Sequence, residues 1–278
     1  MINKGNIMRK PKLVKYDIFN DKLSDVWTGY KIAFFADFHN NDYRVDETCI
    51  LNRLEEFKPD CIMIAGDIIV SKPGSCNQKA YEFLHKLADR YKIYFSNGNH
   101  EFRAKIYPSL YGNMYDEFLS ALKHDNIVHL VNETSYIIRD DEKIAVKGLE
   151  IDAWFYDRFK KHDMHADYIE SKVGKKEDVY EILLAHNPKY FMAYSEYGSE
   201  LVLSGHVHGG LVRLPLIGGV VSPDVTFFPK YDYGMFKEKN STMLLTSGLG
   251  AHTIKFRLFN PPEIMAITLH GGNNGNIS

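Results

Sequence analysis

The strongest constraint in the sequence is the recurrence of short apolar segments that each stop at an Asp, Asn or His. Five such segments are predicted to be buried β-strands: 31–36, 61–65, 93–95, 179–185 and 201–203. They are continuous apolar runs that are too short for helices and long enough for strands buried on both faces. The apolar residues of 46–57 and 78–90 recur at helical spacing, so a helix is expected between consecutive early strands. This alternation favours parallel pairing and predicts an α/β protein.

Later strands are more crowded along the chain. They are predicted at 127–131, 134–139, 143–148, 242–246 and 263–269. The short connections between them indicate a mixed sheet. No linker or repeat divides the 278 residues, so a single domain is expected over 13–270, with flexible termini at 1–12 and 271–278.

Composition excludes some classes of protein. The formal net charge is −2, so no overall positive field favours nucleic acid as a partner. The three cysteines lack metal-site spacing and cannot all pair, which favours a reducing compartment. No run approaches the roughly 18 to 20 apolar residues that a membrane span requires, and the first residues do not resemble a signal peptide. A cytoplasmic protein is expected.

The polar residues that follow the five apolar strands are Asp37, Asp67, Asn99, His186 and His206. Ligand sites in α/β proteins gather where the carboxyl ends of strands meet their loops. These side chains are therefore expected to converge, although they span about 170 positions of sequence. Alone, an Asp-x-His triplet or a Gly-Asp dipeptide is more often a turn or a cap, and a His-x-His pair can equally be two solvated histidines of a strand. The whole set, with each member at a strand end, is improbable by chance.

The residue types at these ends are typical metal ligands. Asp37 and His39 point to the same side of an extended chain, and the carboxylate of Asp67 has two oxygens that can bridge two ions. His206 and His208 lie between glycines, which leaves both imidazoles room to face one ion. A site of oxygen and nitrogen ligands without thiolates suits Mn, Fe or Zn better than Ca or Mg.

The full set of segments resembles the calcineurin-like metallophosphoesterase superfamily, whose signature blocks are present over residues 30–210. Within it the chain is similar to a bacterial branch typified by YkuE and YaeI. That closer similarity rests on residues 37–40, 204–210, 227–231 and 259–264. The resemblance implies two mixed β-sheets packed as a sandwich and flanked by α-helices.

The resemblance also implies a role for each matching residue. One metal would be held by Asp37, His39, Asp67 and His208, and the other by Asp67, Asn99, His186 and His206. His100 would be a catalytic residue that stays off the metals and assists the leaving oxygen. Asn40 and Arg213 adjoin these segments and are expected to contact the substrate phosphate.

The function expected is hydrolysis of a phosphoester, most simply a phosphodiester, by a hydroxide that bridges two divalent ions, with Mn favoured. An alternative is hydrolysis of a lipid-linked pyrophosphate such as UDP-2,3-diacylglucosamine, and a third is a non-catalytic metal-binding scaffold. The aromatic, proline-containing stretch 211–235 is expected either to pack against the domain or to contact a bulky substrate or a membrane surface.

Overall fold

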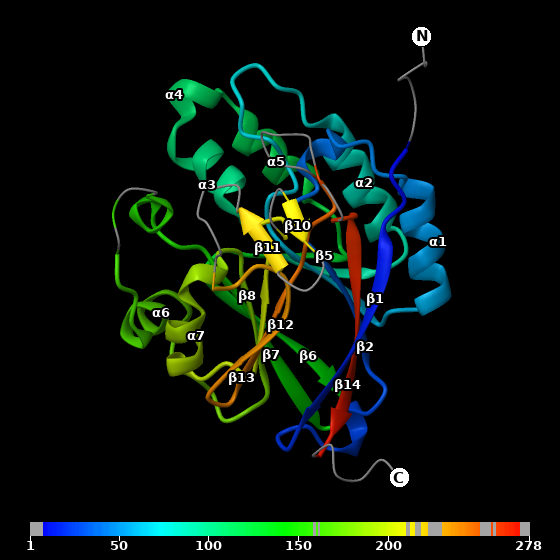
Figure 1. The fold of residues 1–278 in the computed structure, drawn as a ribbon, viewed down its shortest axis with the longest axis vertical. Coiled ribbons are helices and arrows are strands. Elements are labelled where there is room, and N and C mark those ends of the chain that lie inside the picture. Colours follow the sequence, from blue (N-terminus) through cyan, green and yellow to red (C-terminus); the bar gives the residue numbers. More distant parts are fainter. Residues whose placement is uncertain are drawn as a thin grey trace.

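Two six-stranded β-sheets packed face to face form the centre of the protein, as Figure 1 shows. The structure is a computed structural model that describes residues 8–157, 160, 162–209, 212–214, 218–221, 230–250, 257 and 260–272, with the backbone alone for 212–214 and 218–221. Helices cover both outer faces of the sandwich. The predicted sandwich of two mixed sheets flanked by helices is confirmed.

The first sheet has a parallel centre and one antiparallel contact. Its strands, in spatial order, are β1 (Lys12–Asn20), β14 (Glu263–Gly271), β2 (Lys31–Phe35), β3 (Cys61–Ala65), β4 (Lys92–Ser96) and β5 (Ile127–Leu130). Strands β2 to β5 are parallel, β14 runs antiparallel to β2, and β1 runs parallel to β14. The outer face of this sheet is covered by helices α1 (Glu47–Phe57), α2 (Gln78–Ala88), α3 (Asn99–Ile106), α4 (Pro108–Tyr111) and α5 (Met114–Ala121).

The second sheet also has parallel strands in the centre, but its two edge strands pair antiparallel with their neighbours. Its order is β12 (Gly234–Glu238), β13 (Ser241–Leu245), β9 (Leu201–Ser204), β8 (Glu181–Ala185), β7 (Glu142–Leu149) and β6 (Glu133–Arg139). Helices α6 (Ala166–Val173) and α7 (Phe191–Tyr197) cover its outer face. A separate hairpin pairs β10 (Val212–Leu214) with β11 (Gly218–Val221).

The apolar strands of the sequence are continuous because both of their faces are buried. In β2, Ile32 and Phe34 pack between the two sheets, while Ala33 and Phe35 pack under the helices. Successive side chains of a strand point to opposite faces, so a strand covered on both sides needs apolar residues at every position. This pattern made the central strands easy to predict.

The edge strand β1 was not among the predicted strands. Its sequence mixes Lys12, Lys15 and Asp17 with apolar residues, because one edge of the strand faces solvent. It pairs with β14 over nine residues, and Arg9 forms a further β-bridge with Val45. Arg9 and Lys12, within the segment 1–12 that was expected to be flexible, take part in β-structure, and β14 ends one residue beyond the expected domain end. Among the described residues, no helix has the length and apolarity needed to cross a membrane.

His129 on β5 is a half-buried histidine that the fold keeps neutral. It lies beside the rings of Phe95 and Phe118, and its Nε2 is 2.8 Å from Oδ1 of Asn97. Burial, assisted by the positive charge of Lys105, lowers the pKa of His129 to about 4. The unfolded chain binds a proton at this ring more tightly than the folded chain does. The neutral ring's contribution to stability is therefore complete above pH 6.5 and decreases as the pH falls towards 4.

We therefore expect a His129→Gln variant, which keeps a donor for Asn97 but cannot be protonated, to lose part of the acid sensitivity. Between pH 8 and pH 5 the free energy of unfolding should fall by about 2 kcal/mol more in the wild type than in the variant. Urea unfolding across this range measures the difference, and parallel curves for the two proteins would contradict the prediction.

Candidate metal centre

The five predicted strand ends meet at one end of the sandwich. Nδ1 of His186, directly after β8, is 2.6 Å from the carbonyl oxygen of Ala65 at the end of β3. The backbone N–H of Asp37 donates to Gly66, and that of Gly205 donates to His186. The seven residues expected as ligands are thereby brought together, with His206 partly exposed and the other six buried: Asp37, His39, Asp67, Asn99, His186 and His208.

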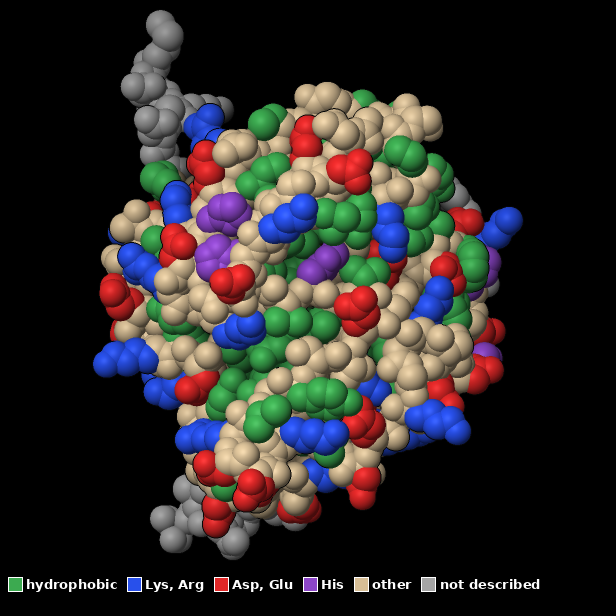
Figure 2. Space-filling model, turned by 180° about the vertical axis from the view of Figure 1, so that it is seen from behind, with side chains coloured by type: hydrophobic (Ala, Val, Ile, Leu, Met, Phe, Trp, Pro, Cys, Tyr) green, Lys and Arg blue, Asp and Glu red, His purple; other side chains and the backbone are tan. Residues whose placement is uncertain are grey.

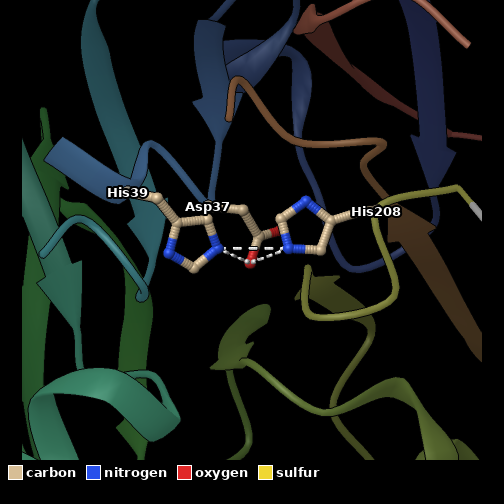
Figure 3. A group of neighbouring side chains, drawn as sticks. All are labelled: Asp37, His39 and His208. Carbon is tan, nitrogen blue, oxygen red and sulfur yellow. Dashed lines mark hydrogen bonds and ion pairs between the residues drawn. The ribbon is translucent and has the colours of Figure 1, made fainter. Parts of the chain in front are cut away.

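Asp37, His39 and His208 form the first group, shown in Figure 3. The imidazoles come from different segments and point towards the same carboxylate, and their Nε2 atoms lie 3.1 Å apart. Oδ1 of Asp37 is 3.7 Å from Nε2 of His208 and 4.0 Å from Nε2 of His39. Neighbouring ligands of one ion, each bound at about 2.1 Å, lie roughly 3 Å apart, so this spacing fits a single divalent ion.

Asp67, His186 and His206 form a second group close to Asp37. Oδ2 of Asp67 is 3.2 Å from Nε2 of His186, which is in turn 3.9 Å from Oδ1 of Asp37. Asp67 also lies in a third group with His39 and His100, so its carboxylate is shared between neighbouring sets of donors. This is the position expected for a bridging ligand.

Asn99 supports the presence of an ion by the state of its side chain. Its Oδ1 is buried and accepts no hydrogen bond from the part of the chain that the structure describes. A buried amide oxygen without a partner costs about 1–3 kcal/mol, and coordination to a cation would remove that cost. The residues present therefore fit a pair of divalent metal ions.

The backbone at the ligand positions is strained. Five of the seven candidate ligands have φ in the left-handed region: Asp37 (58°), His39 (48°), Asp67 (54°), His206 (72°) and His208 (50°). This conformation costs non-glycine residues on the order of 1 kcal/mol each, and such residues concentrate at functional sites. Neighbouring glycines permit the turns, since a Cβ on Gly205 would lie 2.7 Å from Oδ2 of Asp37.

Glu101 is a structural residue of the site whose role was not predicted. Its buried carboxylate accepts hydrogen bonds from the backbone N–H groups of Asp67, Ile68, Ile69 and Gly98 at 2.8–3.1 Å. It thus joins the loop after β3 to the start of α3. The available signal was its place three residues after Gly98, where a capping glutamate is common.

The charged groups of the site shift one another's pKa values. Burial raises the pKa of Asp37 to about 7, and the charge of Asp67 adds to that effect while His186 opposes it. Burial alone would also raise the pKa of Asp67, but His186 and His100 outweigh it and hold that pKa well below its ordinary value. Burial would lower the pKa of His186, yet Asp67 and Asp37 raise it to about 9. Divalent ions would take the place of the His186 proton as the positive charge beside the two carboxylates.

His100 is oriented by Ser71. The backbone N–H of Ser71 donates to Nδ1 of His100 at 2.8 Å, and the Ser71 hydroxyl oxygen is 3.0 Å from the same nitrogen. Since Nδ1 accepts a hydrogen bond, the neutral ring carries its proton on Nε2. Nε2 lies 4.0 Å from Oδ2 of Asp67 and so faces the metal centre. The sequence contains no pattern that pairs these two residues.

The two predicted substrate contacts have different outcomes. The side chain of Asn40 donates to the carbonyl of Cys76 at 2.8 Å and accepts from the N–H of Ala80 at 3.0 Å. It therefore connects the turn after β2 to the first turn of α2, which is a structural role that the sequence did not predict. Arg213 lies on β10, and its side chain is not described, like the other side chains of 211–229.

Tyr156 is a further residue beside the site that was not predicted. Its ring makes an edge-to-face contact with that of His206, with centroids 5.6 Å apart, and burial raises its pKa well above 10. Trp154, two residues earlier, is exposed over 52% of its surface. Nothing in the local sequence distinguishes these aromatic residues from ordinary packing residues.

Comparison with known proteins agrees with this geometry. The family model described as calcineurin-like phosphoesterase matches residues 30–210. The chain is 27% identical to the metallophosphoesterase YkuE of Bacillus subtilis, covering 88% of this chain and 80% of YkuE. It is 26% identical to the phosphodiesterase YaeI of Escherichia coli, covering 70% of this chain and 66% of YaeI. It is 22% identical to the UDP-2,3-diacylglucosamine pyrophosphatase LpxG of Chlamydia muridarum, covering 85% of this chain and 82% of LpxG. Because the family match spans more than half of the sequence and includes every predicted ligand, this chain belongs to the calcineurin-like phosphoesterase family.

Proposed function

We propose that this protein hydrolyses phosphodiesters with the help of two divalent metal ions. The observation that carries the proposal is the convergence of four candidate histidine ligands on the two buried carboxylates of Asp37 and Asp67. When bound, two such ions supply an activated water molecule and neutralise charge on the phosphoryl oxygens. The donors are carboxylate, amide and imidazole, a set that suits Mn, with Fe and Zn as alternatives.

The protein's own contribution is to place the donors and to supply a proton. Asp37, His39 and His208 would hold one ion, and Asn99, His186 and His206 would hold the other, with Asp67 shared between them. The Ser71 hydrogen bond leaves the proton of His100 on Nε2, on the side that faces Asp67. From there His100 can donate to a phosphoryl oxygen or to the departing alkoxide.

A second candidate substrate is a pyrophosphate diester attached to a lipid. The supporting observation is Tyr156, whose ring contacts that of the candidate ligand His206, with the exposed Trp154 two residues earlier in the chain. Aromatic surface beside a metal centre would accommodate an apolar or a nucleoside group of the substrate. The relative named LpxG acts, by its name, on such a pyrophosphate. The scaffold alternative is disfavoured because no expected ligand is missing.

The partners and the cellular location stay predictions. Figure 2 shows one face of the molecule, on which acidic and basic side chains are interspersed around a central group of hydrophobic ones. The coloured part of this face has no continuous basic surface, in keeping with the net charge of −2. We infer that nucleic acid is not a substrate, and we place the protein in the cytoplasm, with peripheral membrane contact through 211–235 as the alternative.

The first test of the proposed function is metal-dependent turnover. Metal-stripped protein resupplied with Mn²⁺ should hydrolyse bis-p-nitrophenyl phosphate faster than p-nitrophenyl phosphate, and Asp67→Asn should lose at least a hundredfold in kcat because both ions depend on this carboxylate. UDP-N-acetylglucosamine, added as a pyrophosphate diester, tests the second candidate in the same assay. Absence of turnover of all three compounds by protein with two bound ions would contradict the proposal.

The role of His100 is tested with leaving groups of different basicity. A His100→Asn variant should bind Mn²⁺ as the wild type does, yet lose about 100-fold or more in kcat on a dialkyl diester, whose alkoxide leaving group needs a proton. The loss should be much smaller with bis-p-nitrophenyl phosphate, because p-nitrophenolate departs without a proton. His124→Asn, in the loop after α5, where the His124 side chain lies beside Asp89, serves as the control. An equal loss with every leaving group would argue against proton donation.

A further inference from the structure

A loop near the C-terminal end of the chain presses against the first group of ligands. Residues 247–250 follow β13, and the N–H groups of Leu249 and Gly250 donate to the carbonyls of Ala36 and Asp37 at 3.0 Å and 2.5 Å. A Cβ added to Gly248 would lie 2.8 Å from Cβ of Asp37, and one added to Gly250 would lie 2.5 Å from its carbonyl oxygen. Only glycine allows the loop to approach Asp37 so closely.

Arg257 holds this loop in place from behind. Its guanidinium is buried and donates to the carbonyls of Gly248 and Gly250 at 3.0 Å and 2.5 Å, and also to that of Ser247. Glu263, at the start of β14, accepts from the N–H of Ser247 at 3.0 Å. One planar cation thus binds three carbonyls of a single turn, which fixes the shape of the turn that contacts Asp37.

Asn260 extends the same device to a second ligand. Its Nδ2 donates to the carbonyl of His208 at 2.5 Å, and a Cβ on Gly209 would lie 3.0 Å from its amide atoms. Its Oδ1 also lies 3.3 Å from a guanidinium nitrogen of Arg257. We name residues 247–250, Arg257 and Asn260 the C-terminal clamp. It contacts the backbone of Asp37 and His208, both of which have left-handed φ.

The other group of ligands is held by a different part of the chain. The carboxylate of Glu101 accepts hydrogen bonds from the backbone N–H groups of Asp67, the shared ligand, and of Gly98, the residue before Asn99. His186 is fixed by the bond from its Nδ1 to the carbonyl of Ala65. These contacts lie between β3, α3 and β8, without the help of the C-terminal clamp.

We propose that the C-terminal clamp sets the affinity of one metal ion, the one bound by Asp37, His39 and His208, independently of the other. The inference rests on the metal centre of the proposed function but not on its substrate. Arg257 and Asn260 are positioning residues: they keep two strained ligands in the binding conformation before the ion arrives. Without them, Asp37 and His208 would relax, and binding would have to restore the strained backbone.

The test is a titration of metal-stripped, full-length protein with Mn²⁺. Binding is monitored by calorimetry and by the electron paramagnetic resonance signal of free Mn²⁺. The wild type should bind two equivalents. In Arg257→Ala and in Asn260→Ala, one equivalent should keep its wild-type affinity and the other should bind at least tenfold more weakly. Arg257→Lys, which keeps the charge and three donors, should recover part of the loss.

Two variants that each lack one ligand show which of the two ions depends on Arg257. In His186→Ala, which retains the first group, adding Arg257→Ala should weaken the remaining ion at least tenfold. In His39→Ala, which retains the second group, the same addition should leave the remaining affinity unchanged. Glu101→Gln should weaken both ions, because its carboxylate supports the shared Asp67 as well as Asn99.

Ser241→Ala is the control for a general loss of stability. Its hydroxyl donates to the carbonyl of Ser199 at the opposite end of the second sheet, so its removal should leave both Mn²⁺ affinities unchanged. The proposal is overturned if Arg257→Ala and Asn260→Ala weaken both ions or neither, or if the effect persists in His39→Ala. Because the count of bound ions requires no turnover, a protein that binds two ions and hydrolyses no diester would refute the proposed function and leave this inference standing.

Discussion

The burial of two carboxylates at converging strand ends is the constraint on which the rest of the site depends. Asp37 and Asp67 are almost completely removed from solvent, and each needs positive charge or hydrogen-bond donors to remain ionised. Backbone N–H groups supply part of this, from His206 to Asp37 and from His100 to Asp67. His186, which lies within 4 Å of both carboxylates, supplies charge. The site therefore combines buried negative charge with donor groups that can bind cations.

The fold provides this arrangement through the direction of its strands. The central strands of both sheets are parallel within each sheet, and all five that carry candidate ligands deliver their carboxyl ends to one end of the sandwich. The apolar contacts between the sheets, such as those of Phe34 and Leu184, lie directly beneath. A rigid packed core thus supports loops whose own conformations are strained.

Much of the fold and the list of candidate ligands could be predicted from sequence, and the reasons are physical. Strands such as 61–65 are apolar at every position because both faces are buried, so they are visible in a single sequence. The ligand types recur at their ends, and the family resemblance orders them. Glu101, Ser71 and Arg257 could not be predicted in the same way. Each acts through backbone groups that have no sequence signature, or across more than two hundred positions, as Arg257 does towards Asp37.

The pairing of β1 with β14 determines how a tether at either strand would orient the metal centre relative to a support. β14 runs antiparallel to β2 and β1 runs parallel to β14, so Lys12 and Glu263 lie at the end of the sandwich that carries the metal centre. Asn20 and Gly271 lie at the opposite end. A tether joined after β14 would leave the metal centre facing away from the support, whereas one joined before β1 would start beside it. The two ends of this domain are therefore not equivalent handles for immobilisation or fusion.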